Sequence, residues 1–443
     1  MAAALVLLLV LLLLLGAGGA RGGLWGFGGA RGAPWGGALH LLHPQGALHL
    51  GRLARGRGPV LHVRGGGRDV LVLSSVGTIR EALARNWGVW MGRPPSYLGS
   101  LVSRGGQDLA LGGGSPGWRS QRAAARGALG RAGGRLRPLL SHQAALLCEE
   151  LRSHGGAPLD PFEIFAFHTC STIGRLLFGD LVLPNPGLRE LLRLVEKRDA
   201  FVEAQIRRHQ EHPSPPADTV LGALWGGDPG VRGGPLGPAR LHMTLVDLFI
   251  GGTETTAAAL GWAVAFLLHR PELQPQLRSE LTVALGPTGT PAPGDASRLP
   301  LLQAVVTETL RLRPPAPLGL PHRAARHTSV AGVPVPAGSI LVPNLLAAQT
   351  DPDTWHDPEA FLPERFLAPG APVRALLPFG CGARACPGEG VARAELFVFL
   401  GHILRDFRLE PPAPGELPGL GVRGGTVLRC PPFRVRLTPV GPP

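Results

Sequence analysis

The spacing of apolar residues along the chain predicts a series of helices, the longest of which is apolar on nearly every side. These helices cover residues 78–86, 118–151, 161–178, 241–269, 271–285, 301–312 and 388–404. A helix without a polar face is buried on all sides in a soluble protein. We therefore expect residues 241–269 to run through the centre of the molecule.

Strand signals are few and short. Residues 60–63 and 70–73 are rich in valine and leucine, and residues 328–343 predict a small hairpin that turns at residues 336–338. Residues 213–239 are dense in proline and glycine and predict a surface loop. The predicted fold is therefore mainly α with small peripheral β-sheets.

The N-terminus carries an apolar segment of its own. Residues 1–20 contain no charged side chain, residues 5–15 are almost all leucine and valine, and the first basic residue, Arg21, follows them. Positive charge after the apolar run favours an uncleaved N-terminal membrane anchor with the body on the cytoplasmic side, although a cleaved signal peptide is the alternative. We expect an anchor at 1–20, a glycine-rich hinge at 21–39 and one large catalytic domain over 40–443.

Composition narrows the possible classes of protein. The 443 residues are 44% hydrophobic and 17% charged, which excludes general disorder. The net charge of +13 indicates either a diffuse basic surface or a docking face for an acidic partner or membrane headgroups. No nucleic-acid-binding motif accompanies the charge, so we expect no nucleic-acid partner. The five cysteines fit neither a disulfide framework nor a zinc site, which favours a reducing compartment.

One cysteine stands in an unusual setting. Residues 379–388 read FGCGARACPG, so that Cys386 is followed by a predicted helix and preceded by Arg384 and several glycines. A helix N-terminus and a nearby arginine both lower a thiol pKa and favour a thiolate. One thiolate cannot hold zinc alone, but it suffices as the axial ligand of a haem iron. A buried structural cysteine is the alternative, and Cys381 keeps that interpretation.

A possible ion-pair cluster precedes this loop. Glu308 and Arg311 lie three residues apart on an otherwise apolar helix, and can therefore pair on one face. Such a pair is usually a solvated surface contact. Here it is expected to be buried, with Arg365 of the PERF sequence at residues 363–366 as a second guanidinium.

The central helix contains a polar stretch with two glycines. Residues 251–256 read GGTETT. Each glycine costs about 1 kcal/mol relative to alanine inside a helix, and the missing side chains would let a flat cofactor approach the backbone. Thr255 can hydrogen-bond the carbonyl one turn earlier, and Glu254 could relay protons. A simple helix kink with a surface glutamate is the alternative.

Together these features resemble the cytochrome P-450 superfamily of haem-thiolate monooxygenases. The residues that match its cysteine loop are Phe379, Gly382, Arg384, Cys386 and Gly388. The E-x-x-R pair and the PERF sequence precede the loop in the superfamily's order. The resemblance implies the cytochrome P-450 fold, haem b ligated by Cys386, and proton delivery to bound oxygen by Glu254 and Thr255. It also implies electrons from NADPH through a flavoprotein, NADPH-cytochrome P-450 reductase.

The resemblance also implies residues that hold the haem propionates. These are Arg93, Trp118, Arg122, His322 and Arg384. Each of them alone would more often be an ordinary surface residue, so this assignment rests on the family pattern.

Within the superfamily, several segments are most similar to the steroid 21-hydroxylases. They are residues 185–189, 196–199, 250–256, 260–264, 311–314, 320–323 and 379–386. This similarity implies an enzyme of the endoplasmic reticulum membrane that faces the cytosol and hydroxylates carbon 21 of progesterone or 17-hydroxyprogesterone. Arg198 would bind the 3-keto oxygen of the steroid.

The stretch after Asp180 is shorter than in that family, where it forms part of the roof over the substrate pocket. The alternatives are a steroid 17-hydroxylase or xenobiotic monooxygenase, a haem-thiolate isomerase, and an inactive or non-catalytic haem protein.

Overall fold

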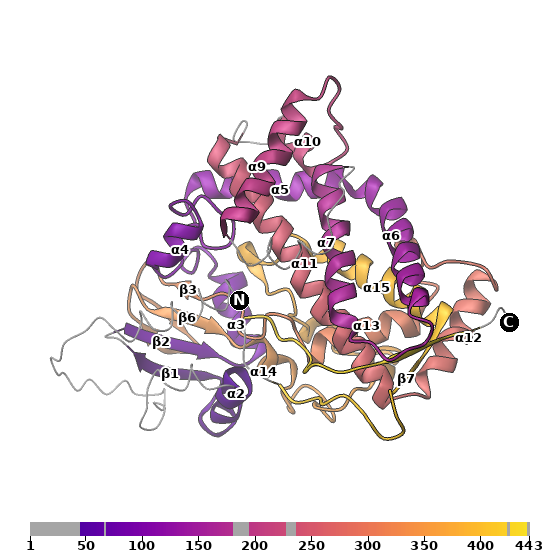
Figure 1. Cartoon of the computed structure of the whole chain (residues 1–443). Helices are drawn as coiled ribbons and strands as arrows, with labels where there is room; N and C mark the ends of the chain where they lie inside the picture. The colour runs from indigo at the N-terminus through magenta and orange to yellow at the C-terminus, as the bar shows by residue number, and fades with distance from the viewer. Residues whose placement is uncertain (1–44, 66–67, 180–194, 227–235, 423–425, 441–443) are drawn as a thin grey trace.

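A computed structural model describes most of the chain. It covers residues 45–65, 68–179, 195–226, 236–422 and 426–440 (Figure 1). The predicted anchor, the hinge and the short stretch after Asp180 lie outside these ranges. Within them, no helix combines the length and the apolar character needed to cross a membrane.

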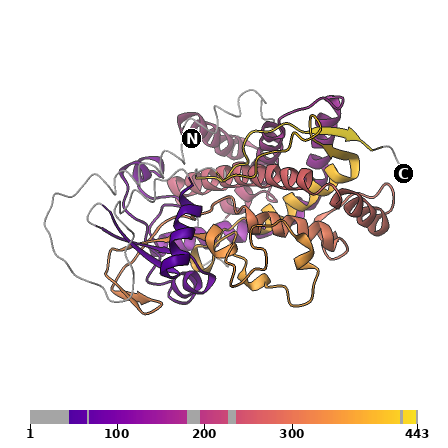
Figure 2. The same cartoon turned by 90° about the horizontal axis from the view of Figure 1, so that it is seen from below.

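Helix α11 (Pro238–His269) forms the centre of the molecule, as its apolar sequence predicts. It runs through the body in Figure 2, and α7 (Pro161–Phe178), α13 (Pro300–Leu312) and α15 (Glu389–Asp406) pack against it. Residues from all four helices form the largest hydrophobic core, in which Trp262 is fully buried. These helices begin and end within a few residues of the predicted limits.

The single helix expected over residues 118–151 is wrong, because the structure has two helices there. Helix α5 (Pro116–Arg131) ends before Ala132, and α6 (Gly133–Ser153) begins after it. Two consecutive glycines, at positions 133 and 134, follow the break. Glycine has a low helix propensity, and the periodic apolar pattern continues across it.

The loop expected over residues 213–239 is also wrong in part. It contains a short helix, α10 (Val220–Trp225), which the side chain of Thr219 caps by accepting a hydrogen bond from the amide of Gly222. Three residues of this helix, Val220, Leu221 and Leu224, are buried. Six residues with a good cap and three buried side chains thus form a helix despite flanking prolines.

The remaining helices are short or peripheral. They are α2 (Gly46–Arg57), α3 (Val76–Arg80), the π-helix η2 (Glu81–Arg85), α4 (Tyr97–Val102), α9 (Val195–Glu211), α12 (Leu273–Leu285) and α14 (Leu345–Gln349). Single 3-10 turns are η4 (Pro293–Asp295), η5 (Pro363–Phe366), η6 (Val373–Ala375) and η7 (Gly382–Arg384).

The sheets lie at the periphery, on one side of the helical body (Figure 1) or beside its end. The largest has the strand order β1 (Val60–Gly65), β2 (Arg68–Leu73), β6 (Ile340–Pro343), β3 (His322–Arg323). Two two-stranded sheets pair β4 (Thr328–Val330) with β5 (Val333–Val335) and β7 (Phe407–Glu410) with β8 (Arg436–Pro439). The predicted fold class, mainly α with small peripheral sheets, is confirmed.

The hairpin turns earlier than predicted. β4 and β5 are joined by Ala331 and Gly332, which have φ angles of 49° and 76°. Two consecutive residues in this left-handed region form the tight turn that matches the twist of a hairpin. Residues 336–338 instead lead into β6, which pairs with β2 and β3 in the larger sheet.

Candidate functional site

A cavity of about 360 Å³ lies between α11 and the loop that carries Cys386. Its walls come from segments far apart in the sequence, among them the first turns of α15 and the middle of α11. Cys386, Gly251 and Thr255 all line it. The fold therefore brings the cysteine loop and the polar stretch of the central helix to one space.

The cysteine loop is held in a fixed conformation by its own backbone. The amide of Cys386 donates to the carbonyl of Phe379 at 2.9 Å. Gly382 has φ of 72°, and a Cβ at this position would lie 1.8 Å from the carbonyl oxygen of Leu83 in η2. Only glycine fits so close to another backbone. A Cβ at Gly388 would lie 3.9 Å from the sulfur, so ordinary contact remains possible there.

The expectation that the surroundings of Cys386 lower its thiol pKa is wrong for the protein groups alone. Its sulfur is accessible from the cavity, but the surrounding protein atoms desolvate it, and this raises its pKa above the ordinary value. The amide of Gly388 opposes this effect, and the nearby cation that lowers the pKa is Arg122 rather than Arg384. A bound metal would change the balance, because coordination itself favours the thiolate.

Four cationic or potentially cationic side chains line the same cavity. They are Arg93, Arg122, His322 and Arg384. Their hydrogen bonds go to backbone carbonyls: Arg93 donates to Leu320 and Pro321 at 3.0 and 2.8 Å, and Arg384 to Met91 at 2.7 Å. Arg122 donates to the carbonyl of Ala385, in the cysteine loop, and Nδ1 of His322 lies 2.8 Å from the carbonyl of Trp90.

The positive charge of these four side chains is not balanced by neighbouring carboxylates within the described part of the chain. None of the four forms an ion pair with a carboxylate of the described residues. Burial, and then the charge of Arg384, lower the pKa of Arg93 well below its usual value. Burial and then Arg122 lower the pKa of Arg384 to about 10. Buried guanidiniums that oppose one another in this way form a site for anionic groups.

Trp118 belongs to the same region but not to the cavity wall. Its indole nitrogen donates to the carbonyl of Leu109 at 3.0 Å, and the guanidinium of Arg384 lies 4.0 Å from the centre of its ring. A cation over an indole face is stabilised electrostatically. Trp118 thus positions Arg384 from behind.

The two glycines of the central helix have different surroundings. Helix α11 continues through both of them. A Cβ at Gly251 would meet nothing within 4 Å, whereas one at Gly252 would lie 2.7 Å from the side chain of Ile173 in α7. Gly251 thus leaves space in the cavity, and Gly252 permits α7 to pack closely. Thr255 Oγ1 donates to the carbonyl of Gly251 at 2.6 Å, as expected from its spacing.

Glu254 is not among the residues that line this cavity. It forms an ion pair with Arg429 of the C-terminal segment, and the guanidinium of Arg429 lies 4.4 Å from the ring centre of Phe162. About half of the Arg429 side chain is exposed (47%), against 27% for Glu254. The carboxylate therefore lies between solvent and the helix turn that carries Thr255.

Arg198 lies in α9 with only 7% of the residue exposed. Its guanidinium donates twice to Asp199, at 2.8 and 2.6 Å. It does not line the cavity, whereas Asp247 does. Desolvation raises the pKa of the Asp247 carboxyl, and the charge of Arg198 partly opposes this effect. The predicted substrate residue thus stands behind a carboxylic acid that faces the cavity.

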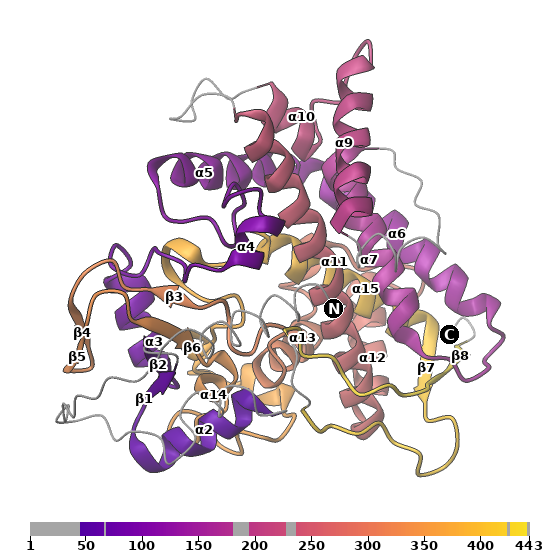
Figure 3. The same cartoon turned by 60° about the vertical axis from the view of Figure 1, so that its left-hand side comes forward.

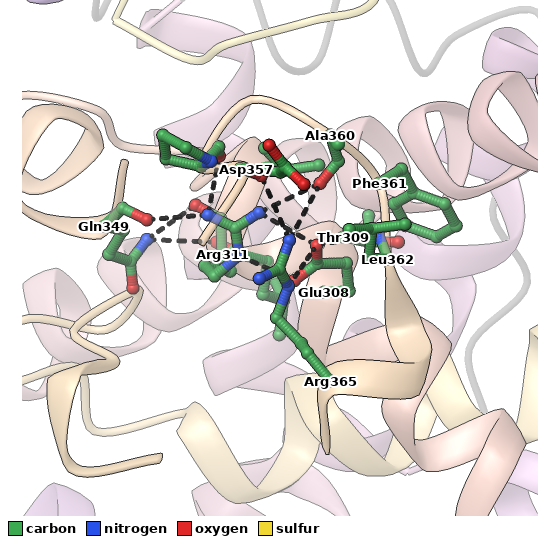
Figure 4. A network of polar contacts seen from close by, with 12 residues as sticks. Glu308, Thr309, Arg311, Gln349, Asp357, Ala360, Phe361, Leu362 and Arg365 are labelled. Carbon is green, nitrogen blue, oxygen red and sulfur yellow. Dashed lines mark hydrogen bonds and ion pairs between the residues drawn. The ribbon is translucent and has the colours of Figure 1, made fainter. Parts of the chain in front are cut away.

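The cluster around Glu308 forms as the sequence predicts (Figure 4). Glu308 and Arg311 have no exposed side-chain surface, and two hydrogen bonds of 2.6 and 2.8 Å join them. Arg365 donates to the same carboxylate at 3.1 Å. Gln349, which the sequence gave no reason to single out, accepts from the amide of Leu377 at 2.7 Å. The cluster therefore fixes the segment that enters the cysteine loop.

Comparison with known protein families agrees with this geometry. The profile described as "Cytochrome P450" matches residues 28–206 and 180–435. This chain belongs to the cytochrome P450 family. It is therefore a haem-dependent monooxygenase, and haem is its cofactor.

Relatives and solved structures of the P450 family resemble the chain over most of its length. Steroid 21-hydroxylases of Felis catus, Bos taurus and Homo sapiens are 44%, 42% and 40% identical to it, and each match covers 91% of this chain and 90–91% of the relative. A zebrafish cytochrome P450 solved with progesterone has a TM-score of 0.81 at 32% identity and covers 89% of this chain. The same kind of protein solved with abiraterone has a TM-score of 0.80 at 33% identity.

The residues of the cavity fit a haem. A thiol faces the space from one side, Gly251 leaves the opposite wall open, and the cationic cluster lacks the anionic partner that two propionates would supply. Two carboxylic acids at this cavity were not predicted from the sequence: Asp247, which is half-buried, and Glu395, which is buried. Asp247 accepts the amide of Leu109 at 2.5 Å, and Glu395 has one carboxyl oxygen without a hydrogen bond among the described residues.

Proposed function

We propose that this P450 is a steroid 21-monooxygenase, which hydroxylates carbon 21 of progesterone and 17-hydroxyprogesterone. The observation that carries the proposal is the 40–44% identity to steroid 21-hydroxylases over about nine-tenths of both chains. The solved P450 with progesterone supports the same class of substrate.

In this proposal the sulfur of Cys386 would ligate the haem iron. Arg93, Arg122, His322 and Arg384 bind the propionates, and Trp118 positions Arg384. When bound, the haem activates dioxygen, and its thiolate ligand favours cleavage of the O–O bond. The structural residues Phe379, Gly382 and Gly388 keep the loop in place, and the Glu308–Arg311–Arg365 cluster anchors the segment before it.

Thr255 and Glu254 move protons toward the cavity. Thr255 lines the space and keeps its hydroxyl oriented by donating to Gly251. Glu254 is partly exposed to solvent one residue earlier on the helix, where Arg429 holds it. Side chains of consecutive helical residues do not face each other, so a proton taken up by Glu254 would reach Thr255 only when the ion pair with Arg429 opens and the carboxylate turns toward the cavity.

The substrate is oriented by few polar groups within an apolar space. Most of the cavity wall is apolar, with Leu109, Leu248 and Ala259 among its residues. Asp247 faces this space, and burial followed by the charge of Asp108 raises its pKa to about 8. Asp247, with Arg198 behind it, provides a polar group for the 3-keto oxygen. The apolar wall then packs against the rest of the steroid.

Electrons come from NADPH-cytochrome P-450 reductase, which docks on the side of the cysteine loop. A hollow of about 590 Å³ lies there between α5 and α15, and Arg126, Arg393 and Pro387 line it. Arg119 is exposed on the same helix as Arg126, two turns away. An acidic partner surface would be attracted to these side chains.

We also propose that residues 1–20 anchor the protein in the membrane of the endoplasmic reticulum, with the catalytic domain of residues 40–443 on the cytosolic side. Residues 21–39 are the hinge between them. The support is the uncharged leucine-rich sequence followed by arginine. Protease digestion of intact microsomes should remove the catalytic domain, whereas a lumenal domain would be protected.

The test is steroid turnover by the purified, haem-loaded protein with reductase and NADPH. We expect progesterone to yield the 21-hydroxy product, identified by mass spectrometry and retention time. Oxidation at carbon 17 or on a xenobiotic instead would contradict the proposed substrate. Haem binding without any steroid turnover would support the non-catalytic alternative.

A further inference from the structure

A second cavity, of about 620 Å³, lies between α9, α10 and the first turns of α11, in the region at the top of Figures 1 and 3. We call it the roof cavity. Its walls include Ile206, Leu224, Trp225 and His242, with Arg104 and Glu203 at its polar edge. It shares no lining residue with the cavity that Cys386 faces.

His242 is the unusual member of this wall. Only 3% of its side chain is exposed, yet neither ring nitrogen has a hydrogen-bond partner within the described ranges. The nearest carboxylate oxygen is Oδ1 of Asp199, at 3.7 Å from Nε2, which is too far for a hydrogen bond. That oxygen already accepts two hydrogen bonds from Arg198. The protein thus leaves a buried imidazole with both polar atoms unsatisfied at the edge of an open space.

The charges nearest to His242 are paired with one another. Arg104 donates to Glu203 at 2.7 Å and to Asp199 at 3.2 Å. Burial and then the charge of Arg104 lower the pKa of His242. The imidazole is therefore neutral near pH 7, and has one donor and one acceptor. The rest of the wall is mostly apolar, with Leu224, Trp225 and Leu241 among its residues, and Arg207 and Gln210 lie at its exposed rim.

We propose that the roof cavity is a second binding site, for an uncharged and mostly apolar molecule whose carbonyl or hydroxyl oxygen hydrogen-bonds to His242. A neutral imidazole can donate to a carbonyl and can both donate to and accept from a hydroxyl. The apolar walls take up the rest of the molecule. The carboxylate of Glu203 at the edge is already paired with Arg104, and the buried imidazole carries no charge to attract an ionic group.

The test measures binding of a probe while the haem cavity is blocked. The haem-loaded protein is saturated with clotrimazole, an azole that coordinates the iron, and saturation is followed by the Soret band. Tritiated progesterone is then added as a neutral, apolar probe, and bound probe is measured by equilibrium dialysis. We expect a single saturable site to remain in the blocked protein.

Two variants and one matched control identify the site. His242→Phe keeps the size of the side chain but removes its polar atoms, and is expected to weaken probe binding by about tenfold. Ala239→Trp fills the roof cavity from an exposed position, so that it does not threaten folding, and is expected to abolish binding. Val283→Trp, on the exposed side of α12, makes a similar change elsewhere and should bind as the original protein does.

The proposal is overturned if the blocked protein shows no saturable binding, or if all variants bind the probe equally. The carbon monoxide spectrum of each variant checks that it is folded. The measurement does not use product formation, so it can succeed if the proposed steroid hydroxylation fails, and it can fail if that activity is found.

Discussion

Replacing Glu308 by glutamine should destabilise the protein strongly. The carboxylate accepts two hydrogen bonds from Arg311, one from Arg365 and one from the amide of Leu362, and it has no exposed surface. The amide keeps the shape but loses the charge, and its NH2 group faces donors. Removing one partner of a buried ion pair costs about 3–5 kcal/mol. This loss is a large part of the free energy of unfolding of a typical folded domain, which is about 5–15 kcal/mol.

The assay is equilibrium urea unfolding of the haem-loaded protein, followed by far-ultraviolet circular dichroism and by Soret absorbance. The Soret signal should disappear at lower urea than in the original protein, because the cluster holds the segment that leads into the cysteine loop through Gln349 and Leu377. The control is Asp218→Asn, which removes a surface pair with Arg135 in which 61% of the aspartate is exposed. That pair should contribute less than about 1 kcal/mol. Equal losses in the two variants would refute the reasoning.

Three further predictions concern the cavity. Thr255→Val removes the hydroxyl that donates to Gly251, so product per NADPH should fall by about 100-fold while NADPH is still oxidised; unchanged coupling would exclude a role in proton delivery. Arg198→Ala should raise the progesterone concentration for half-maximal Soret shift by about tenfold, because it removes the charge behind the polar end of the proposed substrate site, and an unchanged titration would remove Arg198 from that site. Burial raises the pKa of Glu395 to about 8, from an ordinary value of 4.5. The folded protein then keeps a proton that the unfolded chain releases, so the free energy of unfolding should fall between these pH values, by up to about 1.4 kcal/mol per pH unit. Glu395→Gln should flatten this slope in urea titrations at several pH values, and identical slopes would contradict the shift.

Most of the helical framework could be predicted from the sequence because apolar residues recur at helical spacing over long stretches. The central helix is the clearest case, since residues 241–269 have no polar face and α11 begins only three residues earlier. The break at Ala132 could not be predicted in the same way, because the apolar pattern continues across it. The helix α10 could not be predicted because the prolines and glycines around it favour a loop. Thr219 nevertheless provides a cap, and three apolar residues provide a buried face.

In the candidate site too, features set by local sequence could be predicted, whereas those set by tertiary contacts could not. Glu308 and Arg311 are three residues apart on one helix, so their pairing follows from local geometry. The partner of Glu254 could not be predicted, because Arg429 lies 175 residues away in the chain. The lowered thiol pKa that the sequence predicts for Cys386 is wrong for a similar reason. Its thiol pKa depends on desolvation by the folded protein and on Arg122, whereas the sequence suggested only the neighbouring Arg384 and the helix that follows.

The central claim is that the thiolate of Cys386 ligates the haem iron. The carbon monoxide difference spectrum of the reduced, purified protein tests it most directly. The account predicts the strongly red-shifted Soret band of a thiolate-ligated haem, and its loss in Cys386→Ser. A folded, haem-loaded protein that lacks this band, or a serine variant that keeps it, would contradict the account.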